Sequence, residues 1–240
     1  KAIEEGRNIY NNIKKTVLFL LSSNLGEILT MFVAIIAGLA TPLKAIHILW
    51  VNLITDSLPG LALGVDSGDP DAMKNAPRNP KESLFAHGGL AITVFFGCVI
   101  GIITLSAFLI TPVTSLIDAG QAVNLANLKL ALMDEAIYVQ SQTYAFTTLA
   151  VSQLFNAIGM RNLNRSIFRF NHLENRMMIA AFLIGMLLQI GVTEIDVLIE
   201  VFGTQELSFT EWGCLIALST APLWFHELFV LVKYLKKRTV

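Results

Sequence analysis

Residues 16–38 read TVLFLLSSNLGEILTMFVAIIAG, an apolar stretch that carries the polar string SSNLGE near its centre. Two further strings, NLITD at 52–56 and SQLFN at 152–156, lie within the hydrophobic runs 46–64 and 144–160. A transmembrane helix needs about 20 predominantly apolar residues, and a carboxylate inside such a helix is a functional hypothesis by default. The three strings therefore predict a polar site at one depth within a helical membrane protein.

The composition also indicates a membrane protein. Hydrophobic residues make up 54% of the 240 positions and charged residues 15%, with a mean hydropathy of +0.63. Six apolar runs match the thickness of a bilayer, and they are 16–38, 46–64, 89–110, 144–160, 177–193 and 213–232. We predict an all-α membrane protein with six transmembrane helices. Cys98 and Cys214 lie inside these runs and indicate no disulfide framework.

The basic residues predict the orientation of these helices. All 17 Lys and Arg residues lie outside the six runs, and only Lys44 and Lys129 fall on the side opposite to the others. Because Lys and Arg accumulate in cytoplasmic segments of membrane proteins, we expect both termini to be cytoplasmic. Clusters that flank a membrane give no reason to expect a nucleic acid as partner, and the partner that they do indicate is the lipid bilayer.

The chain divides into a polar start and a membrane domain. Residues 1–15 (KAIEEGRNIYNNIKK) continue without Pro into the first apolar run, so we expect a cytoplasmic stalk helix followed by a six-helix transmembrane domain over 16–240. The segment 65–88 is rich in Asp, Pro, Asn and Gly and is expected to form a cytoplasmic coupling loop. In the external segment 111–142, the string ALMDEAIYVQ at 131–140 is expected to form a short helix.

The polar residues of the first two runs follow helical spacing. Asn24 and Glu27 are three residues apart, while Asn52, Thr55 and Asp56 follow the i, i+3, i+4 pattern. Residues at these spacings share one face of a helix. Each helix therefore presents its side-chain oxygen atoms in one direction. Taken alone, a membrane-embedded Asn, Thr or Gln most often forms a hydrogen bond between helices, so the pair of carboxylates carries the functional interpretation.

A helix break is expected beside these residues. Pro59 cannot donate a hydrogen bond to the carbonyl of Thr55, and Gly60 follows it, so the second helix is expected to be partly unwound. Irregular backbone at this depth lines ion sites in transporters. Oxygen ligands without His or Cys favour a hard cation such as Ca²⁺. The candidate metal ligands are Asn24, Glu27, Asn52, Thr55, Asp56 and Gln153.

Other notable residues have structural interpretations. His226 and Glu227 lie near the cytoplasmic end of the last run, where charged side chains reach water or pair locally. Gly97 and Gly101 form a GxxxG pattern in the third run, which predicts close helix packing, with Gly26 as the expected partner.

The strings also resemble a known family. The run GRNIYNNIKKTVLFLLSSNLGEILTMF, followed by LWVNLITDSLPGLALGVD, is similar to the fifth and sixth transmembrane helices of P-type Ca²⁺-transporting ATPases, especially the sarco/endoplasmic-reticulum-like group. DPDAMKNAPRNPKESL and LSFTEW fit the same family. The resemblance implies the family's fifth to tenth helices and an ATP-driven translocase that exports a cation from the cytoplasm. It also implies that the loop containing Asp71 and Arg78 couples phosphorylation to the membrane helices.

By motif position, the resemblance implies that Asn24, Glu27 and the NLITD residues are cation ligands. Gln153 departs from the family pattern, because two-site relatives carry a Glu there and plasma-membrane-type pumps that move one Ca²⁺ per cycle carry an amide. One Ca²⁺ per cycle is therefore expected, with a further Glu supplied by the fourth helix. The retained Asn24 and Glu27 favour two ions instead.

The resemblance also implies partners that the chain itself does not contain. The sequence holds no DKTGT phosphorylation motif and no TGES motif, so ATP and Mg²⁺ are expected to act through actuator, phosphorylation and nucleotide-binding domains, with further helices, upstream in the same pump. Protons are expected to replace the cation on the carboxylates, with Glu27 as carrier, because burial favours the neutral form of a carboxyl group. The compact loops suggest a bacterial plasma membrane.

Two alternatives remain open at this point. A pump for Mn²⁺ or Na⁺ would use similar oxygen ligands. A six-helix secondary transporter would use an ion gradient in place of ATP, although its usual internal repeat is not evident between the two halves of the chain. A channel is disfavoured, because nothing indicates a ring of symmetry-related ligands.

Overall fold

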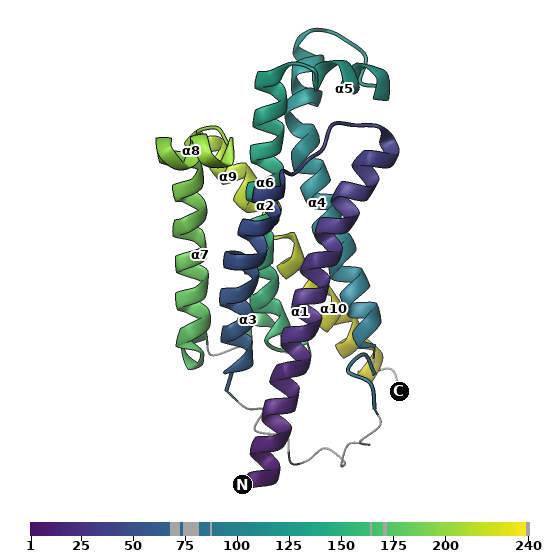
Figure 1. The fold of residues 1–240 in the computed structure, drawn as a ribbon. Helices are drawn as coiled ribbons and strands as arrows, with labels where there is room; N and C mark the ends of the chain where they lie inside the picture. Colours follow the sequence, from purple (N-terminus) through teal and green to yellow (C-terminus); the bar gives the residue numbers. More distant parts are fainter. Residues whose placement is uncertain (68–72, 74–81, 87, 164, 170–171, 239–240) are drawn as a thin grey trace.

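The protein is all-helical wherever its structure is described, and its long helices run side by side (Figure 1). The computed structural model describes residues 1–67, 73, 82–86, 88–163, 165–169 and 172–238. Five helices within these residues are long and apolar enough to cross a membrane: Ala2–Ala37, Ala45–Gly64, Gly89–Asp118, Arg176–Glu194 and Phe209–Leu235. The predicted all-α membrane fold is confirmed at this level.

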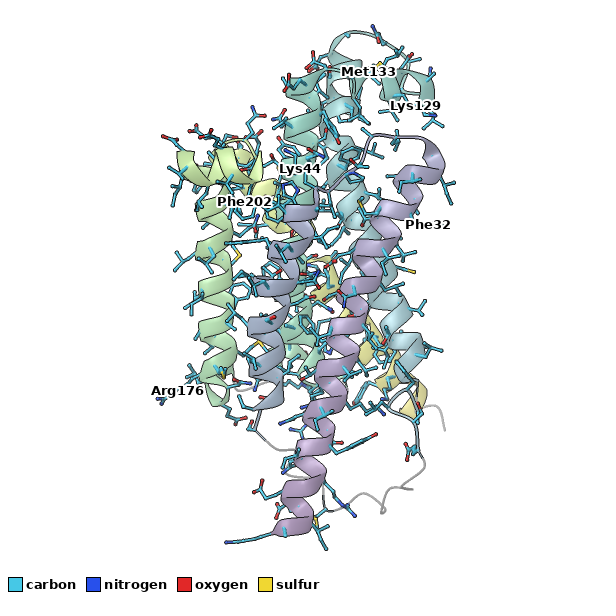
Figure 2. All side chains as sticks on the ribbon, in the orientation of Figure 1. Phe32, Lys44, Lys129, Met133, Arg176 and Phe202 are labelled. Atoms are coloured by element: carbon cyan, nitrogen blue, oxygen red, sulfur yellow. The ribbon has the colours of Figure 1, made fainter. Side chains whose placement is uncertain are left out.

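α1 (Ala2–Ala37) is a single unbroken helix that joins the polar start of the chain to the first apolar run. It ends at Gly38, whose φ of 65° is in the left-handed region and whose backbone N–H closes the last turn on the Ala34 and Ile35 carbonyls. Leu18 and Phe19 are buried against the other helices. Phe32 projects from the outer surface of α1, as a lipid-facing side chain would (Figure 2).

The second span is helical throughout but changes its winding. It consists of α2 (Ala45–Trp50), a π-helical segment η1 (Val51–Asp56) and α3 (Ser57–Gly64). The second span was expected to loosen where its polar residues cluster, and the π-helical segment lies at that place. Its form differs from the expected unwinding, since the span stays helical and Pro59 and Gly60 themselves belong to α3. Because Pro59 has no backbone N–H, it cannot complete the regular α-helical hydrogen-bond pattern. The π-turn just before Pro59 is where the pattern changes.

Side chains satisfy several carbonyls along the π-helical segment. The Ser57 hydroxyl donates to the Asn52 carbonyl at 2.8 Å, and the Thr55 hydroxyl lies 3.1 Å from the Val51 carbonyl oxygen, which shares the single hydroxyl hydrogen with Gln153 Oε1. The Asn52 amide donates to the Ile48 carbonyl at 2.9 Å. The polar residues of this span therefore stabilise its unusual backbone as well as lining its buried face.

α6 (Glu135–Met160) occupies the centre of the bundle, and all of its residues from 141 to 154 are buried. It contains the predicted fourth run, 144–160, but is absent from the five apolar helices described above. The physical reason is its setting: a helix enclosed by other helices needs no lipid-facing surface and carries buried hydroxyls such as Thr147, Thr148 and Ser152. Composition alone therefore supports five of the six predicted spans.

α4 (Gly89–Asp118) packs on α1 through small residues. A Cβ atom added to Gly26 would lie 2.6 Å from Ile100 Cγ2, and one added to Gly101 would lie 3.3 Å from the Gly26 carbonyl oxygen. A Cβ atom on Gly97 would lie 2.8 Å from Leu25 Cδ2. The predicted packing of the third run against Gly26 is therefore confirmed.

The segment 111–142 is more helical than expected. α4 continues through Asp118, and the short helix is α5 (Leu125–Ala131), earlier in the chain than the predicted 131–140. The Asp134 carboxylate accepts hydrogen bonds from the Ala136 and Ile137 backbone N–H groups at 2.9 and 3.2 Å, so that α6 already begins at Glu135. Asp134, a residue type that commonly caps helix N-termini, was the sequence signal that a long helix begins at Glu135.

The remaining elements complete the bundle. Two 3₁₀ turns, η3 (Ile167–Arg169) and η4 (His172–Glu174), lead from α6 to α7. The other helices are α7 (Arg176–Glu194), α8 (Asp196–Phe202), α9 (Phe209–Ser219) and α10 (Ala221–Arg238). The predicted run 213–232 thus contains two helices, which divide at Thr220 beside Pro222. Most of the loop 65–88, including Asp71 and Arg78, lies outside the described residues.

The two ends of the bundle differ in their basic residues. α1 begins and α10 ends toward the same end (Figure 1). Arg176 also lies at that end, whereas Lys44 and Lys129 lie toward the opposite one (Figure 2). This arrangement agrees with the division of basic residues drawn from the sequence.

Candidate functional site

The polar strings of α1, the second span and α6 meet inside the bundle. Glu27 of α1 is 5% exposed and accepts two hydrogen bonds. The Asn52 amide donates to its Oε2 at 3.2 Å, and the Gln153 amide donates to its Oε1 at 3.2 Å. One carboxylate thus joins three separate helical segments.

Gln153 has a defined orientation in this arrangement. Its Nε2 donates to Glu27, while its Oε1 accepts a hydrogen bond from the Thr55 hydroxyl at 2.9 Å. Thr55 and Gln153 are both fully buried. A continuous chain of hydrogen bonds therefore runs from Asn52 through Glu27 and Gln153 to Thr55.

Asp56 differs from Glu27 in its bonding. It is 2% exposed, and within the described residues neither of its carboxylate oxygens accepts a hydrogen bond. The Ser23 hydroxyl lies close enough to interact with the carboxyl group, but no hydrogen bond of good geometry joins them. A buried carboxylate without partners is costly, so this group favours a cation or a proton beside it. Glu27, Asn52, Thr55, Asp56 and Gln153 are called the polar cluster below.

Asn24 is the predicted ligand that is not included in the polar cluster. It is half-buried on α1, and in the described part of the chain it makes no hydrogen bond to the other five predicted residues. Its spacing from Glu27 was the argument for grouping them. A spacing of three residues places the two side chains about 60° apart around the helix.

Several buried polar residues near the polar cluster were not singled out in the sequence. Asn156, one turn beyond Gln153, donates from its Nδ2 to the Ser22 hydroxyl at 3.2 Å. Its Oδ1, like the Ser23 hydroxyl, has no hydrogen-bond partner among the described residues. Ser22, Ser23 and Asn156 belong to the SSNLGE and SQLFN strings. Their position in these strings could have identified them as residues near the site.

A second layer of contacts connects this region to α7. The Trp50 indole N–H donates to Gln189 Oε1 at 3.2 Å, and Gln189 Nε2 donates to the Thr147 hydroxyl at 3.4 Å. Gln189 is fully buried. It therefore ties the second span and α6 to α7 close to the start of the π-helical segment.

His226 and Glu227 make structural contacts away from the polar cluster. The Ile167 backbone N–H donates to Glu227 Oε1 at 2.6 Å, and His226 Nε2 lies 3.0 Å from the Asn162 carbonyl oxygen. Both contacts hold α10 to the connection between α6 and α7. These contacts agree with the interpretation drawn from the sequence.

Comparison with known proteins identifies the family. Residues 40–232 match the family described as cation transporting ATPase, C-terminus. The chain belongs to that family. This match includes the second span, α4 to α9 and the part of α10 up to residue 232.

Named relatives support the same assignment. The chain is 47% identical over 233 residues to calcium-transporting ATPase 1 of Bacillus cereus, an alignment covering 97% of this chain and 26% of the relative. It is 39% identical over 221 residues to the calcium-transporting ATPase of Bacillus subtilis, covering 92% and 23%. It is 31% identical over 248 residues to calcium-transporting ATPase 3, endoplasmic reticulum-type, of Arabidopsis thaliana, covering 99% and 24%. The chain thus spans about a quarter of the length of these relatives.

Proposed function

We propose that this chain is the membrane-embedded, cation-binding part of an ATP-driven P-type pump that exports Ca²⁺ from the cytoplasm. The observation that carries the proposal is the polar cluster, in which two buried carboxylates, Glu27 and Asp56, lie among amides and a hydroxyl. Ca²⁺ prefers such oxygen ligands and takes six to eight of them. The relatives named as calcium-transporting ATPases support the choice of cation.

The proposed topology has six spans with both termini cytoplasmic. The five apolar helices supply five of these spans, and α6 is the sixth, shielded from lipid at the centre. Residues 1–15 form the cytoplasmic stalk, and residues 16–240 form the transmembrane domain with the cytoplasmic coupling loop 65–88. The protein then resides in a membrane, for which we propose the bacterial plasma membrane because two of the relatives are bacterial.

The remainder of the pump supplies the energy. Mg²⁺ and ATP would act at actuator, phosphorylation and nucleotide-binding domains outside this chain, and further membrane helices would complete the cation site. The length of the relatives supports this division, since the chain covers only 23–26% of them. Phosphorylation there would move α1 and thereby alter the polar cluster.

In the proposed cycle, Asp56, Glu27 and Gln153 of the polar cluster have separate tasks. Asp56, whose carboxylate oxygens accept no hydrogen bond within the described residues, is the first ligand for an entering cation. Glu27 exchanges the hydrogen bonds from Asn52 and Gln153 for the cation, and it takes up a proton when the cation leaves. With the neutral Gln153 in place of a third carboxylate, we propose one Ca²⁺ per cycle. Asn24 becomes a ligand only if α1 rotates about its own axis.

The test is cation binding by the intact protein. We expect wild-type protein to bind ⁴⁵Ca²⁺ at equilibrium and to transport it in an ATP-dependent manner, and Asp56→Asn to lose at least about tenfold in affinity, because one ligand charge is removed. Glu27→Gln should weaken binding similarly and also reduce the pH dependence of transport. Mn²⁺ and Na⁺ serve as competing cations.

Asp118→Asn is the matched control, since it removes a carboxylate from an exposed position at the end of α4. It should leave affinity unchanged. If Asp56→Asn binds Ca²⁺ as tightly as wild type, the polar cluster is not the site. If Mn²⁺ or Na⁺ displaces bound ⁴⁵Ca²⁺ at a lower concentration than unlabelled Ca²⁺ does, the proposed substrate is wrong.

A further inference from the structure

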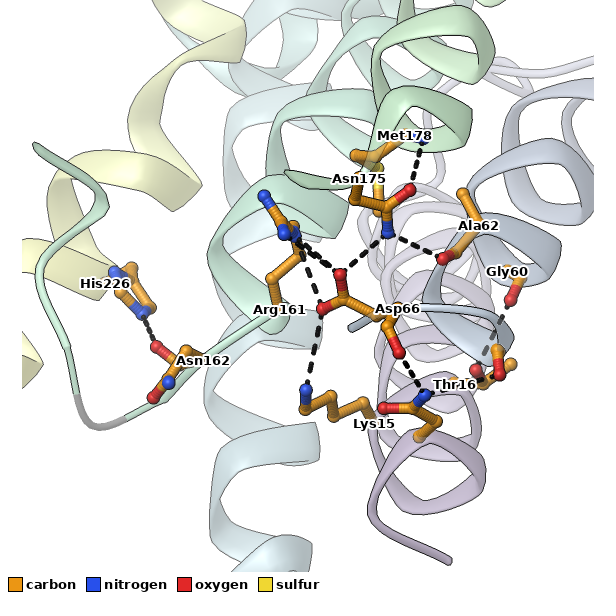
Figure 3. A network of polar contacts seen from close by, with 12 residues as sticks. Lys15, Thr16, Gly60, Ala62, Asp66, Arg161, Asn162, Asn175, Met178 and His226 are labelled. Atoms are coloured by element: carbon orange, nitrogen blue, oxygen red, sulfur yellow. Dashed lines mark hydrogen bonds and ion pairs between the residues drawn. The ribbon is translucent and has the colours of Figure 1, made fainter. Parts of the chain in front are cut away.

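A second buried charge network lies away from the polar cluster, just after α3 ends. Asp66 is 8% exposed and accepts hydrogen bonds from Arg161, whose Nη2 lies 2.9 Å from Oδ1 and whose Nε lies 3.2 and 3.3 Å from the two carboxylate oxygens. Asn175 Nδ2 also donates to Oδ1 at 2.8 Å. Figure 3 shows this convergence on one carboxylate.

α1 contributes to the same network. Lys15 Nζ lies 3.6 Å from Asp66 Oδ2, and Asn12 Nδ2 donates to the Asp66 backbone carbonyl at 2.8 Å. Asn12 is buried, and Lys15 is partly buried. Asn12, Lys15, Asp66, Arg161 and Asn175 are called the Asp66 junction below.

The Asp66 junction joins four separate helices. Asn12 and Lys15 belong to α1, and Asp66 follows α3. Arg161 is the C-cap of α6, and Asn175 is the N-cap of α7, where its Oδ1 accepts from the Met178 backbone N–H at 2.8 Å. Burying a charged pair is costly unless several hydrogen bonds compensate for lost water. A network that meets this condition with residues from four helices fixes their relative positions.

The Asp66 junction and the polar cluster are carried by the same helices, a few turns apart. Arg161 lies about two helical turns beyond Gln153 on α6, and Asp66 lies about three turns beyond Asp56. Between the two sites, the Thr16 hydroxyl donates to the Gly60 carbonyl at 3.3 Å, which ties α1 to α3 once more (Figure 3). A change at the junction would therefore displace the three segments that carry the polar cluster.

We propose that Asp66, through its ion pair with Arg161 and its hydrogen bond from Asn175, is a positioning residue that holds α6 and α7 against α1 and α3 and so sets the affinity of the polar cluster for its cation. Asp66 and Arg161 themselves do not touch the cation. Their effect passes through α6, because Gln153 meets Glu27 and Thr55 only while the three segments keep their alignment. The affinity part rests on the function proposed above, whereas the alignment of the helices does not.

The experiment has two readouts in the intact protein. The first is the concentration of Ca²⁺ for half-maximal transport, measured together with the maximal rate. The second is the distance between spin labels at Ile9 of α1 and Met177 of α7, two exposed positions near the Asp66 junction. For Asp66→Asn we expect the half-maximal concentration to rise about tenfold or more with a largely retained maximal rate. The label distance should broaden or shift.

Two further variants test whether the change in Ca²⁺ affinity follows the contact between Asp66 and Arg161. Arg161→Lys keeps the positive charge but loses the two-nitrogen contact with the carboxylate, so its affinity should lie between those of wild type and Asp66→Asn. Arg176→Gln is the matched control, because Arg176 is exposed at the start of α7, directly after Asn175. It should change neither the affinity nor the distance. If Asp66→Asn yields no folded protein, Arg161→Lys decides by the same two readouts.

The outcomes separate the two proposals. Wild-type affinity in folded Asp66→Asn overturns the positioning role, and so does a weakened affinity with an unchanged label distance. A fall in maximal rate with unchanged affinity also overturns it. If the wild-type protein neither binds nor transports Ca²⁺, the proposed function fails, while the label distance still shows whether the Asp66 junction aligns α1 with α7.

Discussion

Replacing Gly26 by alanine should separate α1 from α4. The added Cβ atom would lie 2.6 Å from Ile100 Cγ2 and 2.9 Å from Ile100 Cβ. A β-branched side chain in a helix has essentially one χ1 rotamer, so Ile100 cannot turn away. The helices must move, and overpacking of this kind typically costs about 1–3 kcal/mol. The helix propensity gained by alanine offsets up to about 1 kcal/mol of that cost. The larger Gly26→Leu variant should prevent assembly of the bundle.

The measurement is thermal unfolding of the purified intact protein in detergent. In a domain of 150–250 residues, each kcal/mol lowers the melting temperature by about 2–4 °C. Gly213→Ala is the matched control, because a Cβ atom on this α9 residue would meet no heavy atom within 4 Å. It should be neutral or slightly stabilising.

Truncation of Ile100 tests whether the named contact is the cause. Ile100→Ala removes Cγ2 and should itself destabilise by about 2–5 kcal/mol, since Ile100 is fully buried. Combined with Gly26→Ala, it should cost less than the sum of the two single changes, because the 2.6 Å contact with Cγ2 disappears, while the 2.9 Å contact with the Cβ atom that alanine retains leaves part of the overpacking in place. An additive double variant, or a Gly26→Ala protein that unfolds at the wild-type temperature, would refute the packing argument.

Three further changes probe the polar cluster and its support. Gln153→Glu should raise the ratio of ⁴⁵Ca²⁺ transported to ATP consumed from one toward two, because it adds a carboxylate between Glu27 and Thr55; an unchanged ratio would contradict the role given to the amide. Thr55→Val leaves Gln153 Oε1 without its donor and should destabilise the protein by about 1–3 kcal/mol in thermal unfolding, with weaker Ca²⁺ binding. Asp134→Ala removes the N-cap of α6 and should cost about 0.5–2 kcal/mol without altering affinity, so a loss of affinity would show that this cap acts on the site.

The sequence predicted the meeting of the three polar strings well. Helices that cross one layer bring residues of equal depth together, and this was enough to join Gln153 to Glu27 across 126 positions of sequence. Helical spacing also placed Thr55 on the buried face of its span. For Asn24 the same rule gives only the expectation that it shares a face with Glu27, and whether it is a ligand stays a prediction, because spacing does not describe how a side chain packs.

The Asp66 junction could not be predicted from these patterns. Arg161 was one of several basic residues that flank the apolar runs and was assigned to membrane orientation, whereas it is buried against a carboxylate 95 positions away. Periodicity reports which face of a helix is apolar, but it carries no information about the partner of a residue beyond the helix end. The π-helical form of the second span was not predicted for a related reason, since Pro59 and the polar residues before it indicated where the helix loosens but not which irregular winding it adopts.

The π-turn at Val51–Asp56 also determines the angular register of the second span. A π-turn accommodates one residue more than an α-turn, and each residue corresponds to about 100° of rotation. Regular α-helical winding of these same residues would rotate α3 by roughly that angle relative to α2, whereas the wide turn takes up the additional residue without that rotation. With regular winding, Asp66 would point away from Arg161 while Trp50 kept its contact with Gln189. The single wide turn is therefore what allows the two ends of one helix to face different partners at the same time.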